Sequence, residues 1–275
     1  MGLRINTNIA GIRSARLLRG STIDLNKSLE RLSSGLRINR AGDDAAGLAI
    51  AEGFRSVRRG SDVAARNAQD GISLVQTAEG ALTQTTEMLQ RIRELAVQAA
   101  NDTNSAQNRT DLQAEVTQLQ QQIDQIANNT EFNGVRPLDG SVVNILLHVG
   151  PRAGQTINVG LPAASTFAVL TGGGTVNLTS QANANATITT MDNALIAVNT
   201  RRSTLGAVQN RLEFTIATLQ IQSENAAASE SVIRDADIAQ ETIAFTRNQI
   251  LVSAGTSVLA QANIIPQTAL QLLGG

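Results

Sequence analysis

The sequence predicts a mainly α-helical protein: a long antiparallel helical bundle or coiled coil in which the N- and C-terminal helices pair, with a small β-hairpin region between them. The first observation is that both ends of the chain carry apolar residues at helical spacing, whereas strand-like sequence occurs only in the middle. The second is that the ends differ in charge. Residues 1–60 hold eleven basic and five acidic side chains, and residues 224–275 hold five acidic and two basic ones. Such ends are expected to pack against each other or against copies of the chain.

The two terminal runs each predict one amphipathic helix. Steps of three, four or seven residues separate the apolar positions within each of two groups, Ile5, Ile9 and Ile12, and then Leu18, Leu25, Leu29, Leu32 and Leu36. Gly35 is expected to end the first helix, and Asp43 or Asp44 to cap a short helix inside a bent connector over 33–52. In the last run, over about 233–262, Ile243, Ile250, Ala254 and Val258 share one stripe, and Pro266 is expected to end the helix.

The middle of the chain predicts further helices and one hairpin. Helical periodicity covers about 62–100 and 112–126, and it resumes from Thr187 to Leu219. Residues 142–149 and 156–159 read as two short strands joined by a Gly-Pro turn. Residues 160–186 are rich in Gly, Thr, Ala and Asn, so we expect an exposed loop or a minimal hairpin there.

The composition argues against an enzyme, a cofactor or a metal site. Only 2% of the residues are aromatic, there is no Cys, and His148 is the single histidine. Asp43 and Asp44 could be read as paired carboxylates, but no third ligand lies near them in the sequence, so a helix cap is the preferred interpretation. His148 is expected to be structural, and Gly172–Gly174 to be a flexible tip without a phosphate-binding role.

Nucleic acid and membranes are also disfavoured as partners. The basic residues of the N-terminal run lie around the helix without aromatic neighbours, and an acidic helix is available within the chain. No stretch approaches about 18 apolar residues, and the first residues lack the apolar block of a cleavable signal peptide.

Several long motifs resemble bacterial flagellin. They are INTNIAGIRSARLL (5–18), LERLSSGLRINRAGDDAAGLAIAE (29–52), ESVIRDADIAQETIAFTRNQILVSAGTSVLAQAN (230–263) and LQLLGG (270–275). The resemblance covers nearly all of 1–160 and 187–275. It implies a filament subunit in which 1–40 and 233–275 form a terminal coiled-coil domain lining an inner tube. It also implies a core helical-bundle domain over 41–159 and 187–232 with the hairpin at 142–159, and a short variable exposed loop over 160–186 in place of outer domains.

The resemblance also implies a set of partners and a location. The chain is expected to form a homopolymer, to meet the flagellar cap and hook-associated proteins, and to be held before export by a flagellin-specific chaperone at its C-terminal helix. Export would use the flagellar type III system, and the filament would be extracellular. The expected subunit-assembly residues are Ile5, Ile9, Leu25, Leu29, Leu32, Ile243, Ile250 and Val258.

One surface of the second helix has two interpretations. It is either a contact between subunits or, by resemblance, the patch that Toll-like receptor 5 recognises on monomeric flagellin. The residues in matching positions are Gln90, Arg91, Leu95 and Glu115.

Two alternatives remain open on the sequence alone. A hook–filament junction protein would share terminal helices of this type, although the INTNIAG opening and the LQLLGG close favour the filament itself. A non-flagellar coiled-coil scaffold would not need the GDDAAGLAIAE connector or the hairpin.

Overall fold

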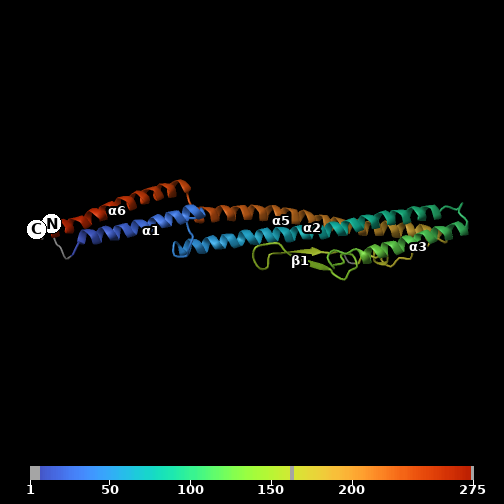
Figure 1. Ribbon diagram of the computed structural model, residues 1–275. Helices are drawn as coiled ribbons and strands as arrows, with labels where there is room; N and C mark the ends of the chain where they lie inside the picture. The colour runs from blue at the N-terminus through green and yellow to red at the C-terminus, as the bar shows by residue number, and fades with distance from the viewer. Residues whose placement is uncertain (1–6, 162–163, 274–275) are drawn as a thin grey trace. The chain divides into compact units, whose positions relative to one another are not determined.

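The computed structural model describes residues 7–161 and 164–273, and the chain divides into two compact units (Figure 1). The terminal unit comprises Met1–Ser56 and Asn225–Gly275, and the central unit comprises Val57–Glu224. The elements in chain order are α1 (Ile9–Ser34), α2 (Ala45–Ala99), α3 (Ala106–Asn129), β1 (Asn144–His148), β2 (Thr156–Gly160), α4 (Phe167–Leu170), α5 (Gln181–Arg234) and α6 (Ile238–Leu273).

In the terminal unit, α1 and α6 lie side by side and antiparallel (Figure 1). Asn8 caps α1, since its side-chain oxygen accepts a hydrogen bond from the Gly11 N–H at 2.9 Å. Gly35 ends α1 in the left-handed conformation, at φ 70°, as predicted. The Arg31 guanidinium lies 3.5 Å from the Glu241 carboxylate, which links the end of α1 to the start of α6.

The breaks that follow α1 and α5 are joined by backbone hydrogen bonds. Leu36 and Asp235 form an isolated antiparallel β-bridge. The Arg37 N–H donates to the Arg234 carbonyl at 2.7 Å, and the Ala236 N–H donates to the Gly35 carbonyl at 2.9 Å. Backbone groups that have no partner at the end of one helix are therefore hydrogen-bonded to the break after the other helix. These bonds hold the two breaks side by side.

The connector ends where α2 begins. Asp44 accepts a hydrogen bond from the Gly47 N–H at 2.8 Å, which confirms it as a helix cap. The helix that it caps is not short, because α2 continues for 55 residues. Asp43 instead binds Lys27 at 2.8 Å and accepts from the N–H groups of Asn39 and Arg40, so it ties the connector to α1.

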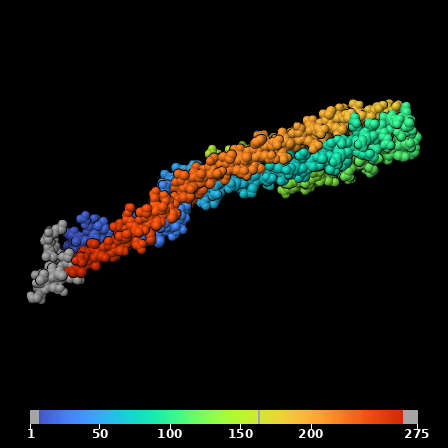
Figure 2. Space-filling model, turned by 90° about the horizontal axis from the view of Figure 1, so that it is seen from above, coloured from blue at the N-terminus to red at the C-terminus, as the bar shows by residue number. Residues whose placement is uncertain are grey.

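In the central unit, α2 and α5 run antiparallel and are linked by polar side chains along their length. Asp62 accepts from Ser223 at 2.8 Å, Glu79 pairs with Arg202 at 3.6 Å, and Arg93 pairs with Asp192 at 2.7 Å. Figure 2 shows the orange surface of α5 lying against the teal surface of α2.

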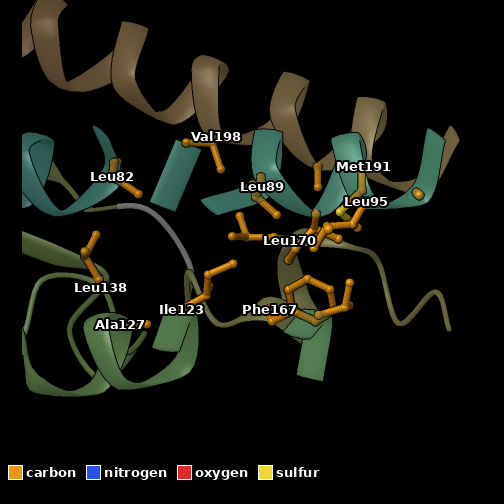
Figure 3. Close-up of a cluster of buried hydrophobic side chains, with 14 of the residues drawn as sticks. Leu82, Leu89, Leu95, Ile123, Ala127, Leu138, Phe167, Leu170, Met191 and Val198 are labelled. Atoms are coloured by element: carbon orange, nitrogen blue, oxygen red, sulfur yellow. The ribbon is translucent and has the colours of Figure 1, made fainter. Parts of the chain in front are cut away.

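The core of the central unit is built from aliphatic side chains of α2, α3 and α5. Figure 3 shows Leu82, Leu89 and Leu95 of α2 converging with Ile123 of α3 and with Met191 and Val198 of α5. Phe167 and Leu170 of α4 close the same cluster. Because the three long helices share one core, no bulky aromatic layer is needed to fill it.

The predicted hairpin is present. Strands β1 and β2 pair antiparallel with Leu146 opposite Asn158, and alternate residues of β2, Ile157 and Val159, are buried. The Asn67 side chain donates to the His148 carbonyl at 2.9 Å, which holds the hairpin on α2.

The expectation that 160–186 forms an exposed loop is wrong. Leu161, Phe167, Leu170 and Leu178 are buried in the core, and α5 already begins at Gln181. Polar side chains of α3 hold the segment, because Asp124 accepts from the Phe167 N–H and Gln113 accepts from the Leu178 N–H, both at 2.7 Å. Arg201 of α5 donates to the Ala164 carbonyl and to Ser165. The Gly- and Thr-rich composition hid these apolar residues, which are spaced too widely to show a period.

The end predicted for the last helix is also wrong. Helix α6 begins at Ile238 after the break near Asp235, and it continues past Pro266 to Leu273. Proline lacks the N–H that would donate to the carbonyl four residues earlier, so it weakens a helix without always ending it.

Two glycines of α2 give a matched prediction. A Cβ at Gly60 would lie 2.9 Å from Cβ and 3.0 Å from Cα of Pro151 in the hairpin turn, whereas nothing lies within 4 Å of a Cβ at Gly80. We expect Gly80→Ala to stabilise the central unit by roughly 0.5–1 kcal/mol, the usual gain in a helix. Gly60→Ala should lose that gain and lower the stability, because the turn must move. Urea unfolding of the two variants measures the difference, and equal stabilisation by both would contradict the close packing.

Candidate assembly surface

Helix α1 exposes large apolar side chains along much of its length. Ile9, Ile12, Leu17, Ile23 and Leu29 each keep half or more of their surface in contact with solvent. Leu25 and Leu32 are half-buried. An amphipathic helix normally turns such residues towards a core, so the exposed stripe indicates a face without its partner.

Helix α6 carries a second such stripe. The exposed residues are Ile238, Ile243, Ile250, Leu251, Val258 and Ile264. A shallow depression on α6 is lined by Ile243, Ile250 and Leu251 together with Thr242, Thr246 and Arg247. Its lining is mostly apolar, and it is suited to an apolar side chain from another helix.

The α1–α6 pair buries little of itself. Among the residues of α1 and α6 whose side chains the structure describes, only Gly11, Ser28 and Ala262 are buried. Full burial of one Ile or Leu side chain contributes about 1.5–3 kcal/mol, so two helices that expose most of theirs gain little from pairing alone. The terminal unit therefore has the surface of a component that is completed by further helices.

Charged side chains fix the connector beside this surface. The hydrogen bond from Lys27, supported by the backbone N–H groups of Arg40 and Asn39, lowers the pKa of Asp43 from 3.8 to about 2. Arg40 pairs with Glu30 at 2.9 Å, and Arg234 pairs with Glu52 at 3.0 Å. The first pair joins the connector to α1, and the second joins α2 to α5 within the terminal unit.

The lowered pKa of Asp43 predicts an acid-sensitive connector. Because the folded-state pKa lies below the unfolded value, the ionised carboxylate stabilises the fold above about pH 4, and this stabilisation disappears as the pH falls towards 2. Asp43→Asn should therefore lower the thermal midpoint at neutral pH, and the difference from the wild type should vanish near pH 2. Circular-dichroism melting from pH 7 to 2 measures this, with Asp24→Asn on the exposed side of α1 as the control. A difference that does not change with pH would contradict the role given to Asp43.

The sequence-predicted assembly residues lie largely on this surface. Ile9, Leu29, Ile243, Ile250 and Val258 are exposed. Ile5 lies outside the described residues. Leu17, Ile23 and Leu251 are also exposed, but the sequence did not single them out because they lie outside the apolar spacing predicted for each terminal helix. Their bulk and their place in a terminal helix were the available signals.

One residue of the predicted receptor-recognition patch is misplaced. Leu95 is only 1% exposed and lies in the core near Met191 (Figure 3), so its inclusion in a surface patch is wrong. Helical periodicity alone could not assign it, since α2 packs against both α3 and α5 and its buried face is wide. Gln90, Arg91 and Glu115 are exposed. Arg91 binds Glu115 at 2.9 Å and Glu94 at 3.3 Å, and these carboxylates raise the pKa of its guanidinium.

The described residues show no cluster of side chains typical of a metal site. They contain no group of three or more His, Cys, Asp or Glu side chains placed to hold a metal ion. His148 is exposed on β1, and its carbonyl accepts the Asn67 hydrogen bond already described. Over the helices that the structure describes, none has a segment long and apolar enough to cross a membrane.

Paired terminal helices with unpartnered apolar faces, joined in sequence to a separate aliphatic bundle, define the class of self-assembling helical subunits. The comparisons with known proteins identify the family. The family model for the bacterial flagellin N-terminal helical region matches residues 5–142, and the model for the C-terminal helical region matches residues 188–273. The chain belongs to the bacterial flagellin family.

Individual relatives agree with this assignment. The chain is similar to a flagellin of Halalkalibacterium halodurans, at 48% identity over 98% of this chain and 99% of the relative. It is 45% identical to a flagellin of Bacillus subtilis, over 98% of this chain and the whole of the relative. The crystal structure of Bacillus cereus flagellin superposes with a TM-score of 0.51 at 36% identity, covering 60% of this chain and 94% of that chain.

Family membership confirms the short-form flagellin and the mainly helical fold predicted from the sequence. It makes the chain a structural subunit of the flagellar filament and not an enzyme, and the flagellar filament is an extracellular structure. No finding favours a hook–filament junction protein or a non-flagellar scaffold.

Proposed function

We propose that the chain polymerises through the apolar faces of α1 and α6, which other copies cover in the inner part of the filament. The observation that carries this proposal is the exposure of Ile9, Ile12, Ile243 and Ile250 in a single chain. An apolar face of this size is normally covered by a partner, and every other copy of the chain carries the same face.

The terminal helices would then complete their folding on assembly. The pair buries few of its own side chains, so its stability as a monomer depends on a small number of contacts such as Arg31–Glu241. Binding to the folded form stabilises it by mass action, and the neighbouring copies act as that binding partner. The aliphatic core of the central unit lets that unit fold before assembly.

Passage to the growing end requires the same faces to be protected. We assign a flagellin-specific export chaperone to the C-terminal helix, where Ile243, Ile250 and Val258 offer an apolar stripe to a helix-binding groove. The flagellar type III system is the matching export route. Replacing all three residues with Ser should abolish chaperone binding in a pull-down with the purified chaperone, and unchanged binding would reject this assignment.

The two ends of a filament must also meet other proteins. A terminal face that is covered by neighbours in the filament interior is left open at the ends, so hook-associated proteins at one end and the cap at the other would engage α1 and α6. These partners require only helical faces of similar chemistry.

A surface of the central unit supports recognition by Toll-like receptor 5. Gln90, Arg91 and Glu115 are exposed, although the ion pairs of Arg91 must rearrange or be shared when a receptor binds. Arg91→Asp in the monomer should reduce receptor-dependent signalling by tenfold or more. Arg136→Asp, an equal charge change elsewhere on the central unit, should not. Equal activity of the two variants would reject the patch.

The experiment that tests assembly is seeded polymerisation. Purified chain is added to sheared filament ends and followed by circular dichroism and negative-stain electron microscopy. The proposal predicts long thin filaments and a helical signal that rises as they grow. A stable helical dimer that never elongates would reject it.

A further inference from the structure

The amide of Asn8 makes two hydrogen bonds that belong to different helices. Its oxygen caps α1 by accepting from the Gly11 N–H at 2.9 Å. Its nitrogen, Nδ2, donates to the carbonyl of Ala262 in α6 at 2.8 Å. Only this orientation of the amide serves both groups, since the N–H needs an acceptor and the carbonyl needs a donor.

The Ala262 carbonyl is one that α6 cannot satisfy by itself. In an α-helix, a carbonyl accepts from the N–H four residues later, and the residue four positions after Ala262 is Pro266, which has no N–H. The helix nevertheless continues to Leu273. Ala262 is only 6% exposed, so water has poor access to the site, and a buried carbonyl without a donor is costly.

The bond occurs at a close approach of the two helices. A Cβ added to Gly11 would lie 2.8 Å from Asn8 Nδ2 and 3.3 Å from the side-chain oxygen of Asn263. Gly11 therefore leaves room both for the bridging amide and for α6. Further along the pair, a Cβ at Gly255 would lie 3.1 Å from Leu18 Cδ1, so glycine also permits the approach there.

We propose that Asn8 sets the register of the terminal helix pair by donating to the Ala262 carbonyl that Pro266 leaves without a helical donor. Apolar contacts alone specify register weakly, because a helix that slips by one turn still meets an apolar neighbour. A slip here would leave a buried carbonyl unpaired and would move the Asn8 amide away from it. The inference concerns the pairing of α1 with α6 and does not depend on what covers their outer faces.

A double-mutant cycle isolates this bond. Asn8→Asp keeps an acceptor for the Gly11 N–H but cannot donate to Ala262, whereas Pro266→Ala restores an N–H within α6 that can. Four chains are compared (wild type, N8D, P266A and the double variant) by the critical concentration for seeded polymerisation. We expect N8D to raise it roughly tenfold with Pro266 present and less than about twofold in the P266A background, because the hydrogen bond is then dispensable. An equal rise in both backgrounds would overturn the proposal.

A second pair of variants does not rely on changing Pro266. Gly11→Ala and Gly20→Ala lie in the same helix, but nothing is within 4 Å of a Cβ at Gly20. Gly11→Ala should raise the critical concentration and Gly20→Ala should not, and equal effects would contradict the proposed bridge. If the wild-type chain forms no filaments, polymerisation itself is rejected, and both comparisons are then read from the thermal midpoint of the helical signal with the same criteria.

Discussion

Replacing Ile250 with Asp should abolish filament formation while leaving the central unit folded. Ile250 is 63% exposed in the single chain and lines the depression on α6, so the carboxylate stays hydrated in the monomer. In the filament, the same position would be covered, and an unpaired charge buried there costs at least several kcal/mol. This cost is added to the free energy of every subunit contact, because each copy in the polymer carries the substitution. Filament formation should therefore become unfavourable.

Ile250→Leu is the matched control. It keeps the apolar character and the volume of the side chain, so filaments should form with at most a small change in critical concentration. Sedimentation separates filament from monomer, and circular dichroism of the supernatant reports whether the chain is still folded. Normal filaments from the Asp variant would show that this face of α6 stays in contact with water after assembly.

Replacing Leu89 with Ala should give a large loss of stability in the central unit. Leu89 is 0% exposed and lies in the core shared by α2, α3 and α5 (Figure 3). Deleting a fully buried Leu side chain to Ala costs about 2–5 kcal/mol, because the cavity closes only in part. Urea unfolding of the monomer should therefore show a much lower midpoint for this variant.

Ile196→Ala is the corresponding control on α5. Ile196 is 64% exposed, so its truncation should change the free energy of unfolding by no more than about 0.5 kcal/mol. If the two substitutions destabilised the protein equally, the shared core would not be the main source of stability in the central unit.

The helices were predictable because their stripes are long and regular. The apolar residues of α1 and the cap at Asp44 follow local rules, and so does the Gly-Pro turn of the hairpin. The fold class therefore followed from the spacing of apolar residues, and the pairing of the chain ends from that spacing together with the unlike charges of the two ends. The subunit-assembly residues stay a prediction. The family resemblance supplied the biological role.

What the sequence did not predict depends on contacts between distant segments. Leu95 was expected on the surface by resemblance, whereas α2 packs on two sides and buries this side chain. Phe167 and Leu178 lie in a Gly- and Thr-rich stretch. This stretch packs on the core because polar side chains of α3 accept hydrogen bonds from its backbone, a contact that the local sequence does not indicate. The Ala262 carbonyl, which Pro266 leaves without a helical donor, likewise accepts a hydrogen bond from Asn8, which is distant in sequence.

Hydrogen exchange on monomer and filament tests the central claim most directly. The claim is that the exposed faces of α1 and α6 become covered when copies assemble. It predicts that backbone amides of α1 and α6 exchange quickly in the monomer and become strongly protected in the filament, while those in the core of α2 and α5 are protected in both. Terminal helices that are as well protected in the monomer as in the filament would contradict folding on assembly. Terminal helices that remain unprotected in the filament would contradict the assembly surface itself.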